Sequence, residues 1–290
     1  MTESAIGFDC GGDSLVGILH KPDEPLQRGV LFVVGGGPQY RAGGHRQLTL
    51  WSRRLCAEGF PVFRFDYRGM GDAQGEFVGF EGIDEDIGAA VTRFFEAVPE
   101  LKEVVLWGEC DASSAILFYA YRDPRIKGIV LLNPWVRTQA GEAKAILRFY
   151  YLQRVMQPSF WRKVFSFRFN PFASVSSALK LMQVSRTPKG ALAQAATQRL
   201  GAAISREGSL PERLLLGLTR FQGKVMLVLS GRDLIAREFD DLINSNEAWQ
   251  EQLRRKPTTR HDLPESDHTF SSAVQRNQVV VWGLNWLRSW

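Results

Sequence analysis

The sequence predicts an α/β fold in which a mostly parallel central sheet is covered by helices on both faces. Runs of strand length, most of them fully apolar, alternate with segments whose apolar residues recur at helical spacing. Strands buried on both faces are continuous apolar runs, and their alternation with helices indicates parallel β-α-β units. We expect strands at 30–34, 62–65, 104–107, 129–132, 225–229 and 258–263.

Local signals place the remaining elements around these strands. Residues 5–20 hold two alternating runs around Gly11-Gly12-Asp13, which is typical of a β-hairpin. Leu48, Trp51 and Leu55 recur at helical spacing ahead of Gly59, which predicts a helix and its end. Helices are expected at 48–58, 83–97, 116–121, 247–255 and 274–287.

The composition is that of a globular protein. The chain has 290 residues, of which 44% are hydrophobic and 23% charged. No run approaches the ~18 apolar residues that a membrane span needs, and residues 1–9 lack the basic and apolar regions of a signal peptide. Cys10, Cys56 and Cys110 cannot all pair. We therefore expect a cytoplasmic protein with reduced thiols.

The β/α alternation stops at residue 136 and resumes at 223. Ten Lys/Arg and one acid between 137 and 189 give this stretch a local charge of +9, against +5 for the whole chain. We expect one domain, 1–290, with a core of 1–135 and 223–290 and a helical insert, 136–222. A basic insert favours an anionic substrate or a membrane surface over nucleic acid. Helices within it are expected at 145–155, 160–169, 178–184, 190–203 and 210–221.

The stretch 103–114, EVVLWGECDASS, runs from a buried strand through a sharp turn into a helix. This is the layout of a nucleophile elbow, G-x-S-x-G, with Cys110 in place of serine and Ala112 in place of the last glycine. A thiol is more acidic than a hydroxyl, and a helix N-terminus and a histidine activate it further. The alternative is that Cys110 is a buried, inert thiol at a strand end.

Polar side chains suited to acyl transfer follow three of the predicted strands. Cys110, Asp233 and His268 occur in the order nucleophile, acid, histidine. Because the carboxyl ends of parallel strands meet at one edge of the sheet, we expect these residues to gather there. His268 would hold Cys110 as a thiolate or take its proton, and Asp233 would fix the histidine tautomer.

Other residues compete for these roles. Asp233 is also compatible with an ordinary turn aspartate, and Asp262 or Asp267 could then supply the acid. The other histidines occupy less suitable places, namely His20 at a hairpin end, His45 in a glycine loop and His261 within a strand.

The glycine loop Gly35-Gly36-Gly37 follows the strand at 30–34 and predicts part of an oxyanion hole. We expect the donors to be the N–H of Asp111 and that of Gly36 or Gly37, with Gly37 favoured because Pro38 has no N–H. Glu109 and Asp111 also fit carboxylates favoured at a helix N-terminus, and a charge there would raise the thiol pKa. Substrate contacts are expected from residues that border the same strand ends, namely Gln39, Tyr40, Glu109 and Trp135.

No cofactor signature is present in the sequence. G-x-G-x-x-G fails at Gly35 and at Gly69, no G-K-[ST] occurs, and no cluster has metal-ligand spacing. We therefore expect no cofactor and no metal. The expected partner is a small-molecule, lipid or saccharide acyl compound, with no nucleic acid.

Taken together, these motifs resemble the α/β-hydrolase superfamily, and within it the exosortase A system-associated hydrolases. The motifs are the glycine loop, Asp66-Tyr67-Arg68-Gly69-x-Gly71, Gly108 to Ala112, Gly231-Arg232-Asp233 and Ser266-Asp267-His268. The resemblance implies a hydrolase linked to exopolysaccharide gene clusters, with a lid at 136–222. The sequence departs from the superfamily pattern at Cys110, at Ala112 and at Gly35, where a histidine often stands.

The insert carries two groups of side chains that could meet a substrate. Its aromatic residues line an acyl pocket or pack the insert onto the core, and its arginines meet an anionic group, rest on a membrane surface or face solvent. The sequence leaves these readings open. The aromatic group is Phe149, Tyr150, Tyr151, Phe160, Trp161, Phe165, Phe167 and Phe169, and the arginines are Arg148, Arg154, Arg162 and Arg168.

We therefore expect a hydrolase that cleaves an ester or thioester through Cys110, His268 and Asp233 by way of an acyl-enzyme. An acyltransferase would form the same thioester and pass it to an alcohol or amine. A non-catalytic binding or scaffold protein would carry Cys110 as an unreactive thiol, with a pKa near or above ~8.5.

Overall fold

The computed structural model describes residues 1–37, 39–137 and 208–290. The chain divides into two compact units, one made of Met1–Val136 with Pro211–Trp290 and the other of Arg137–Leu210. All the elements described below belong to the larger unit, apart from the first residue of α8. The helices expected at 145–155, 160–169, 178–184 and 190–203 lie outside the described residues, as do the aromatic and arginine side chains of the insert.

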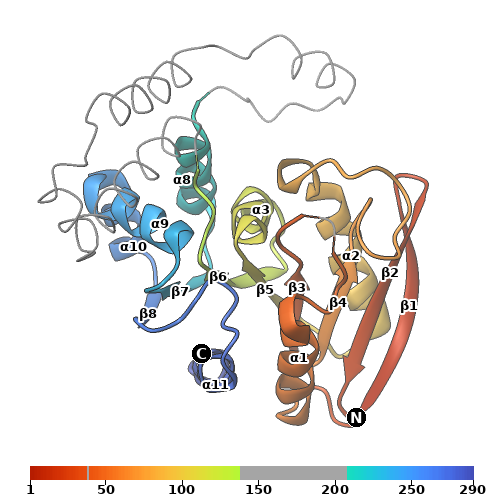
Figure 1. Cartoon of the computed structure of the whole chain (residues 1–290). Helices are drawn as coiled ribbons and strands as arrows, with labels where there is room; N and C mark the ends of the chain where they lie inside the picture. Colours follow the sequence, from red (N-terminus) through yellow and green to blue (C-terminus); the bar gives the residue numbers. More distant parts are fainter. Residues whose placement is uncertain (38, 138–207) are drawn as a thin grey trace, which may run out of the picture. The chain divides into compact units, whose positions relative to one another are not determined.

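An eight-stranded sheet forms the centre of the larger unit (Figure 1). Its order is β1-β2-β4-β3-β5-β6-β7-β8, in which β1 with β2 and β2 with β4 are antiparallel and every other pair is parallel. The predicted α/β class with a mostly parallel sheet is therefore confirmed. The strands are β1 (Thr2–Cys10), β2 (Asp13–Lys21), β3 (Arg28–Val33), β4 (Val62–Asp66), β5 (Glu103–Glu109), β6 (Ile126–Leu132), β7 (Lys224–Ser230) and β8 (Thr258–Leu263).

Helices cover the sheet on both faces (Figure 1). The α-helices are α1 (Gln47–Ala57), α2 (Asp84–Ala97), α3 (Asp111–Tyr119), α8 (Leu210–Arg220), α9 (Leu234–Ser245), α10 (Glu247–Arg255) and α11 (Ala273–Arg288). Short 3-10 turns occur at Gly44–Arg46, Phe80–Gly82 and Ala120–Arg122. None of the helices among the described residues is both long and apolar enough to cross a membrane.

The core around β5 shows how side chains fix the two layers. Trp107 packs against Trp51 of α1, with ring centroids 5.7 Å apart, and a Cβ at Gly283 of α11 would lie 2.3 Å from the Trp107 ring. The next residue, Gly108, faces Ile116 of α3, whose Cδ1 would lie 2.8 Å from a Cβ added there. Because neighbouring strand residues point to opposite faces, α1 and α11 cover one face and α3 the other.

Helix α8 was expected to belong to the insert, but it packs within the larger unit. A Cβ at Gly217 would lie 2.1 Å from the carbonyl oxygen of Leu117, so the backbones of α8 and α3 touch. Leu214 and Leu218 on the same side of α8 are fully buried. The larger unit therefore resumes at Pro211, ahead of the boundary at 223 that the sequence suggested.

Candidate active site

Cys110 occupies a strained turn between β5 and α3. Its φ of 58° and ψ of −127° lie in a region that residues with a Cβ seldom adopt. The Cys110 N–H donates to the Leu132 carbonyl at 2.9 Å, and Ser113 Oγ donates to the Gly108 carbonyl at 2.8 Å. These bonds hold the turn in place, and the Cys110 side chain comes to lie at the carboxyl end of β5, 8% exposed.

Small neighbours allow the chain to make this turn. A Cβ at Gly108 would lie 2.9 Å from the backbone carbon of Ala112, and a Cβ at Gly35 would lie 2.2 Å from the carbonyl oxygen of Glu109. Both distances are shorter than van der Waals contact, so larger side chains would push the helix or the glycine loop away. The glycine loop therefore lies directly against the elbow.

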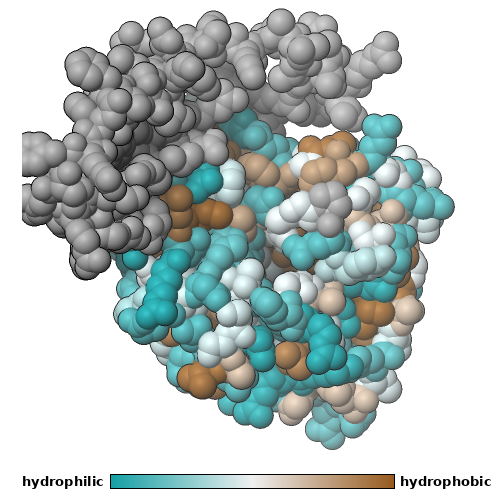
Figure 2. All heavy atoms as spheres, in the orientation of Figure 1, coloured by the Kyte–Doolittle hydropathy of each residue, from teal (hydrophilic) through white to brown (hydrophobic). Residues whose placement is uncertain are grey.

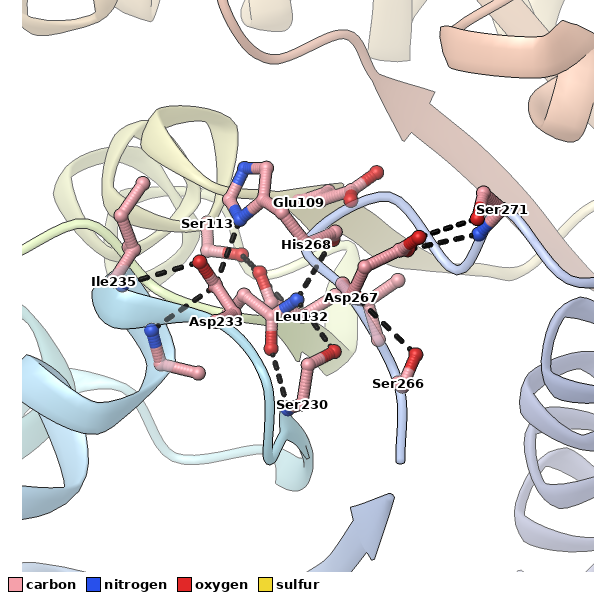
Figure 3. A network of polar contacts seen from close by, with 12 residues as sticks. Glu109, Ser113, Leu132, Ser230, Asp233, Ile235, Ser266, Asp267, His268 and Ser271 are labelled. Carbon is pink, nitrogen blue, oxygen red and sulfur yellow. Dashed lines mark hydrogen bonds and ion pairs between the residues drawn. The ribbon is translucent and has the colours of Figure 1, made fainter. Parts of the chain in front are cut away.

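His268 and Asp233 come from the loops that follow β8 and β7. His268 Nδ1 lies 2.8 Å from Asp233 Oδ2 (Figure 3). Asp233 is also the N-cap of α9, because its carboxylate accepts the N–H groups of Ile235 at 3.2 Å and Ala236 at 3.1 Å. The cap fixes the carboxylate, and the carboxylate in turn fixes the imidazole ring.

The Cys110 thiol interacts with His268, and this interaction opposes the rise in the thiol pKa and raises the pKa of the imidazole. Since Nδ1 of the ring faces Asp233, Nε2 is the nitrogen left for the sulfur. The structure thus brings the three residues of the predicted constellation into one chain of contacts, although they lie on three separate loops.

Asn133, which the sequence analysis missed, ties these loops together. It is fully buried just after β6 with a φ of 44°. Its Nδ2 donates to the carbonyl of His268 at 2.9 Å and to Ser230 Oγ at 3.0 Å, and its Oδ1 accepts the Ser230 N–H at 2.8 Å. An asparagine directly after a buried strand was the available signal, because asparagine tolerates positive φ and bonds backbone groups.

Charges around the thiol act in opposing directions. Burial raises the pKa of Cys110, while hydrogen bonds from His268 and the Asp111 N–H work against that rise and the Asp111 carboxylate adds to it. Burial alone would lower the pKa of His268, but its bonds to Asp233 and Cys110 raise it to about 10. The two groups therefore titrate as a coupled pair, in which a thiolate favours the imidazolium and an imidazolium favours the thiolate, and the pair loses a proton as the pH rises.

The expected oxyanion donors differ in their availability. The Gly36 N–H donates to Asp111 Oδ1 at 2.6 Å, so it is already engaged within the protein. Gly37 is exposed, and no hydrogen bond from its N–H occurs among the described residues. The Asp111 N–H points to the Cys110 sulfur. Of the two glycines, Gly37 is therefore the one whose N–H is available as a donor.

The residues expected to contact substrate are in varied surroundings. Gln39 donates to the Gly35 carbonyl and so braces the glycine loop, while Tyr40 is 58% exposed. Trp135 is half-buried, and its carbonyl accepts from Ser114 Oγ. Glu109 accepts a hydrogen bond from Gln47, and burial raises the pKa of its carboxyl to about 7. Its side chain points away from the Asp233 carboxylate in Figure 3.

The rival acids and histidines are engaged elsewhere. Asp267 accepts the Ser271 N–H at 3.0 Å, and Asp262 pairs with Arg260 at 2.8 Å. His261 stacks on the ring of Trp282 with centroids 4.2 Å apart. Within the described ranges, no grouping of three or more His, Cys, Asp or Glu could hold a metal ion.

A family model described as serine aminopeptidase, S33, matches residues 30–205. The chain belongs to this family. The match includes the glycine loop and the elbow but ends before Asp233 and His268. The family description names serine, whereas the elbow of this member carries Cys110. A search of curated proteins finds no match.

Solved structures with the α/β-hydrolase fold resemble the whole chain. An esterase of Pyrococcus furiosus superposes with a TM-score of 0.64 at 14% identity, over 100% of this chain and 91% of the esterase. A dienelactone hydrolase of Anabaena variabilis gives 0.60 at 15% identity, over 99% and 96%. The α/β hydrolase GrgF of a Penicillium species gives 0.60 at 18%, over 99% and 98%. At these identities the likeness shows a shared fold.

Proposed function

We propose that this S33 family member cleaves an ester or thioester with Cys110 as nucleophile. The observation that carries the proposal is the contact chain from the strained Cys110 turn through His268 to Asp233, with a 2.8 Å bond between the last two. His268 acts on the sulfur, Asp233 orients His268, and the Asp111 N–H points to the sulfur, while the Gly37 N–H of the neighbouring glycine loop has no partner among the described residues. Acyl transfer needs those groups.

In the proposed first step, His268 Nε2 holds the thiol proton while Cys110 Sγ bonds to the substrate carbonyl carbon. The carbonyl electron pair moves onto oxygen, where the N–H groups of Gly37 and Asp111 stabilise it. The tetrahedral intermediate expels the alcohol or thiol, which takes the proton from His268, and leaves an acyl thioester. Water that is deprotonated by His268 then attacks this thioester, releases the carboxylic acid and restores the thiol.

The resemblance to exosortase A system-associated hydrolases supports an acyl substrate from exopolysaccharide or lipid metabolism. The ten Lys/Arg of the stretch 137–189 support an anionic group on that substrate, or contact with a membrane surface. We propose that residues 136–210 act as a lid and supply these basic side chains to the substrate or to the membrane surface.

A second candidate, a non-catalytic binding protein, is favoured by one observation. Burial raises the pKa of the Cys110 thiol, so little thiolate is present at neutral pH. Binding at the same residues would need no thiolate at all.

Steady-state turnover separates these two functions. We would assay a panel of activated acyl esters and thioesters with the wild type and with Cys110→Ala, and use Cys10→Ala as the matched control because Cys10 is also a buried free thiol. The proposal expects turnover by the wild type and the control and its loss in Cys110→Ala. Equal turnover by Cys110→Ala contradicts a thiol nucleophile. No turnover together with slow alkylation of Cys110 selects the binding protein.

A further inference from the structure

Asp111 uses its backbone and its side chain in two different contacts. It is the first residue of α3, directly after Cys110, and its own N–H points to the sulfur. Its carboxylate turns the other way, and Oδ1 accepts the Gly36 N–H at 2.6 Å. The Ala112 N–H also favours the charged form of this carboxylate. A carboxylate bound by several backbone N–H groups at a helix N-terminus is firmly held.

The contact with Gly36 joins two segments that lie 75 residues apart in sequence. Within the loop, the Gln39 side chain donates to the Gly35 carbonyl, whereas Gly36 has no side chain and a φ of 81°, so its N–H is the group that joins it to the elbow. A Cβ at Gly35 would lie 2.9 Å from Asp111 Oδ1, so the loop and the carboxylate are already in close contact. Gly37, whose N–H is the expected oxyanion donor, is the next residue along the loop.

We propose that the Asp111 side chain is a positioning residue that ties the glycine loop to the elbow and thereby sets the Gly37 N–H beside Cys110. The inference rests on the proposed function, because an oxyanion donor matters only where a carbonyl is attacked. An error of about 1 Å in the position of such a donor costs on the order of 100-fold in rate.

The negative charge of Asp111 has an unfavourable effect on the nucleophile. The carboxylate lies close enough to Cys110 to raise the pKa of the thiol, which opposes nucleophilic attack. A neutral acceptor such as asparagine would keep the tie to Gly36 and remove that charge. The two effects of Asp111, tie and charge, are therefore separable by substitution.

The test compares two reactions of the same thiol in Asp111→Ala and Asp111→Asn. Acylation by an activated ester needs the oxyanion donors, whereas alkylation by iodoacetamide displaces iodide and forms no oxyanion. Both substitutions remove the charge, so alkylation should rise in both variants. We expect acylation to fall about 100-fold in Asp111→Ala and to be restored by the conservative Asp111→Asn.

Three results would overturn the inference. Acylation of Asp111→Ala at the rate of Asp111→Asn means that the tie has no role. A parallel fall of acylation and alkylation in Asp111→Ala means that the side chain only stabilises the turn. No acyl adduct on the wild type overturns the proposed function and this inference with it. If Asp111→Ala does not fold, Asp111→Ser is used in its place, because its hydroxyl is too short to reach Gly36 as the carboxylate does.

Discussion

His268 and His20 are both packed against charged partners, yet their surroundings are opposite. His268 lies at the carboxyl edge of the sheet against the Asp233 carboxylate, and its pKa is raised to about 10. His20 is fully buried in β2, where its Nε2 accepts from Arg64 Nε at 3.0 Å. Burial and the Arg64 charge lower the pKa of His20 to about 4.

The difference shows what makes a histidine fit for proton transfer. Beside a cation and away from water, His20 stays neutral and acts as a fixed hydrogen-bond acceptor for a buried guanidinium. Beside a carboxylate and a thiol, with its side chain 32% exposed, His268 can hold a proton and release it. The charged groups around His20 are Arg64, Glu3 and Arg53, with Glu3 the single acid among them, 3.7 Å from Nδ1.

The largest effect is expected from removing the proton acceptor. His268→Ala should lower the rate of Cys110 acylation by about 10²–10⁴-fold, the usual contribution of a positioned general base. Near pH 10 its stability should change little, because the stabilising effect of the raised His268 pKa is lost there. Rapid-quench acylation and a urea titration measure the two quantities. An unchanged acylation rate would remove His268 from the mechanism.

His20→Ala should show the opposite pattern. It leaves the buried Arg64 without its acceptor, so the free energy of unfolding should fall by about 1–3 kcal/mol. Acylation per folded molecule should stay at the wild-type level. The same two measurements apply, and a fall in acylation without a loss of stability would mean that the comparison of the two histidines fails.

The two histidines should also give stability opposite dependences on pH. The ordinary pKa of histidine is 6.5, and folded His20 titrates at about 4. As the pH falls from 6.5 to about 4, His20 becomes protonated in the unfolded chain but stays neutral in the folded protein, so the free energy of unfolding decreases. Folded His268 titrates at about 10, so its stabilising effect is complete below 6.5 and lost as the pH rises towards 10.

Urea midpoints at several pH values would check this prediction. Relative to the wild type, His20→Gln should lose less stability between pH 6.5 and 4, and His268→Gln should lose less between pH 6.5 and 10. The effect is bounded by ~1.4 kcal/mol for each pKa unit. Stability curves that run parallel for all three proteins would contradict the opposite surroundings.

The smallest effect is expected at Glu109. Its carboxyl, with a pKa of about 7, is mostly ionised at pH 8 and favours the protonated form of the nearby His268. Glu109→Gln removes this charge, so the pair of Cys110 and His268 should lose its proton at lower pH. Acylation at pH 8 should rise by less than about tenfold, which corresponds to one pKa unit.

The control for this prediction removes a distant charge. Glu100 is an exposed acid just before β5, at the opposite end of that strand from Cys110, and Glu100→Gln should leave acylation unchanged. An equal rise in both variants would assign the effect to net charge and not to Glu109.

Sequence patterns predicted the architecture because its signals are local. The apolar run expected at 104–107 lies within β5, and the strand expected at 258–263 coincides with β8. The carboxyl ends of parallel strands lie at one edge of a sheet. Because Cys110, Asp233 and His268 each follow a strand, their position at that edge could be predicted.

Contacts made by side chains across long sequence separations could not be predicted in this way. The bond of Asp111 to Gly36 depends on how closely the loop approaches the elbow. The pairing of His20 with Arg64 depends on register between β2 and β4, and Arg64 is the one charged residue of the strand expected at 62–65. Helix α9 was missed because Asp233 was taken only as a catalytic or turn residue and not as a cap.

The sequence also did not predict which apolar side chains lie on the surface, one face of which is shown in Figure 2. On that face hydrophilic residues predominate, with small hydrophobic groups between them. Phe77 and Val78, for example, are more than a third exposed, and no pattern in the surrounding sequence indicated this.

The central claim is that Cys110 forms the covalent bond to the acyl group. Rapid quenching of the wild type with an activated thioester, followed by intact mass spectrometry and peptide mapping, tests it directly. The account predicts a transient acyl adduct on Cys110, absent from Cys110→Ala and formed slowly by His268→Ala. Turnover with no adduct on Cys110, or an adduct on another residue, would contradict it.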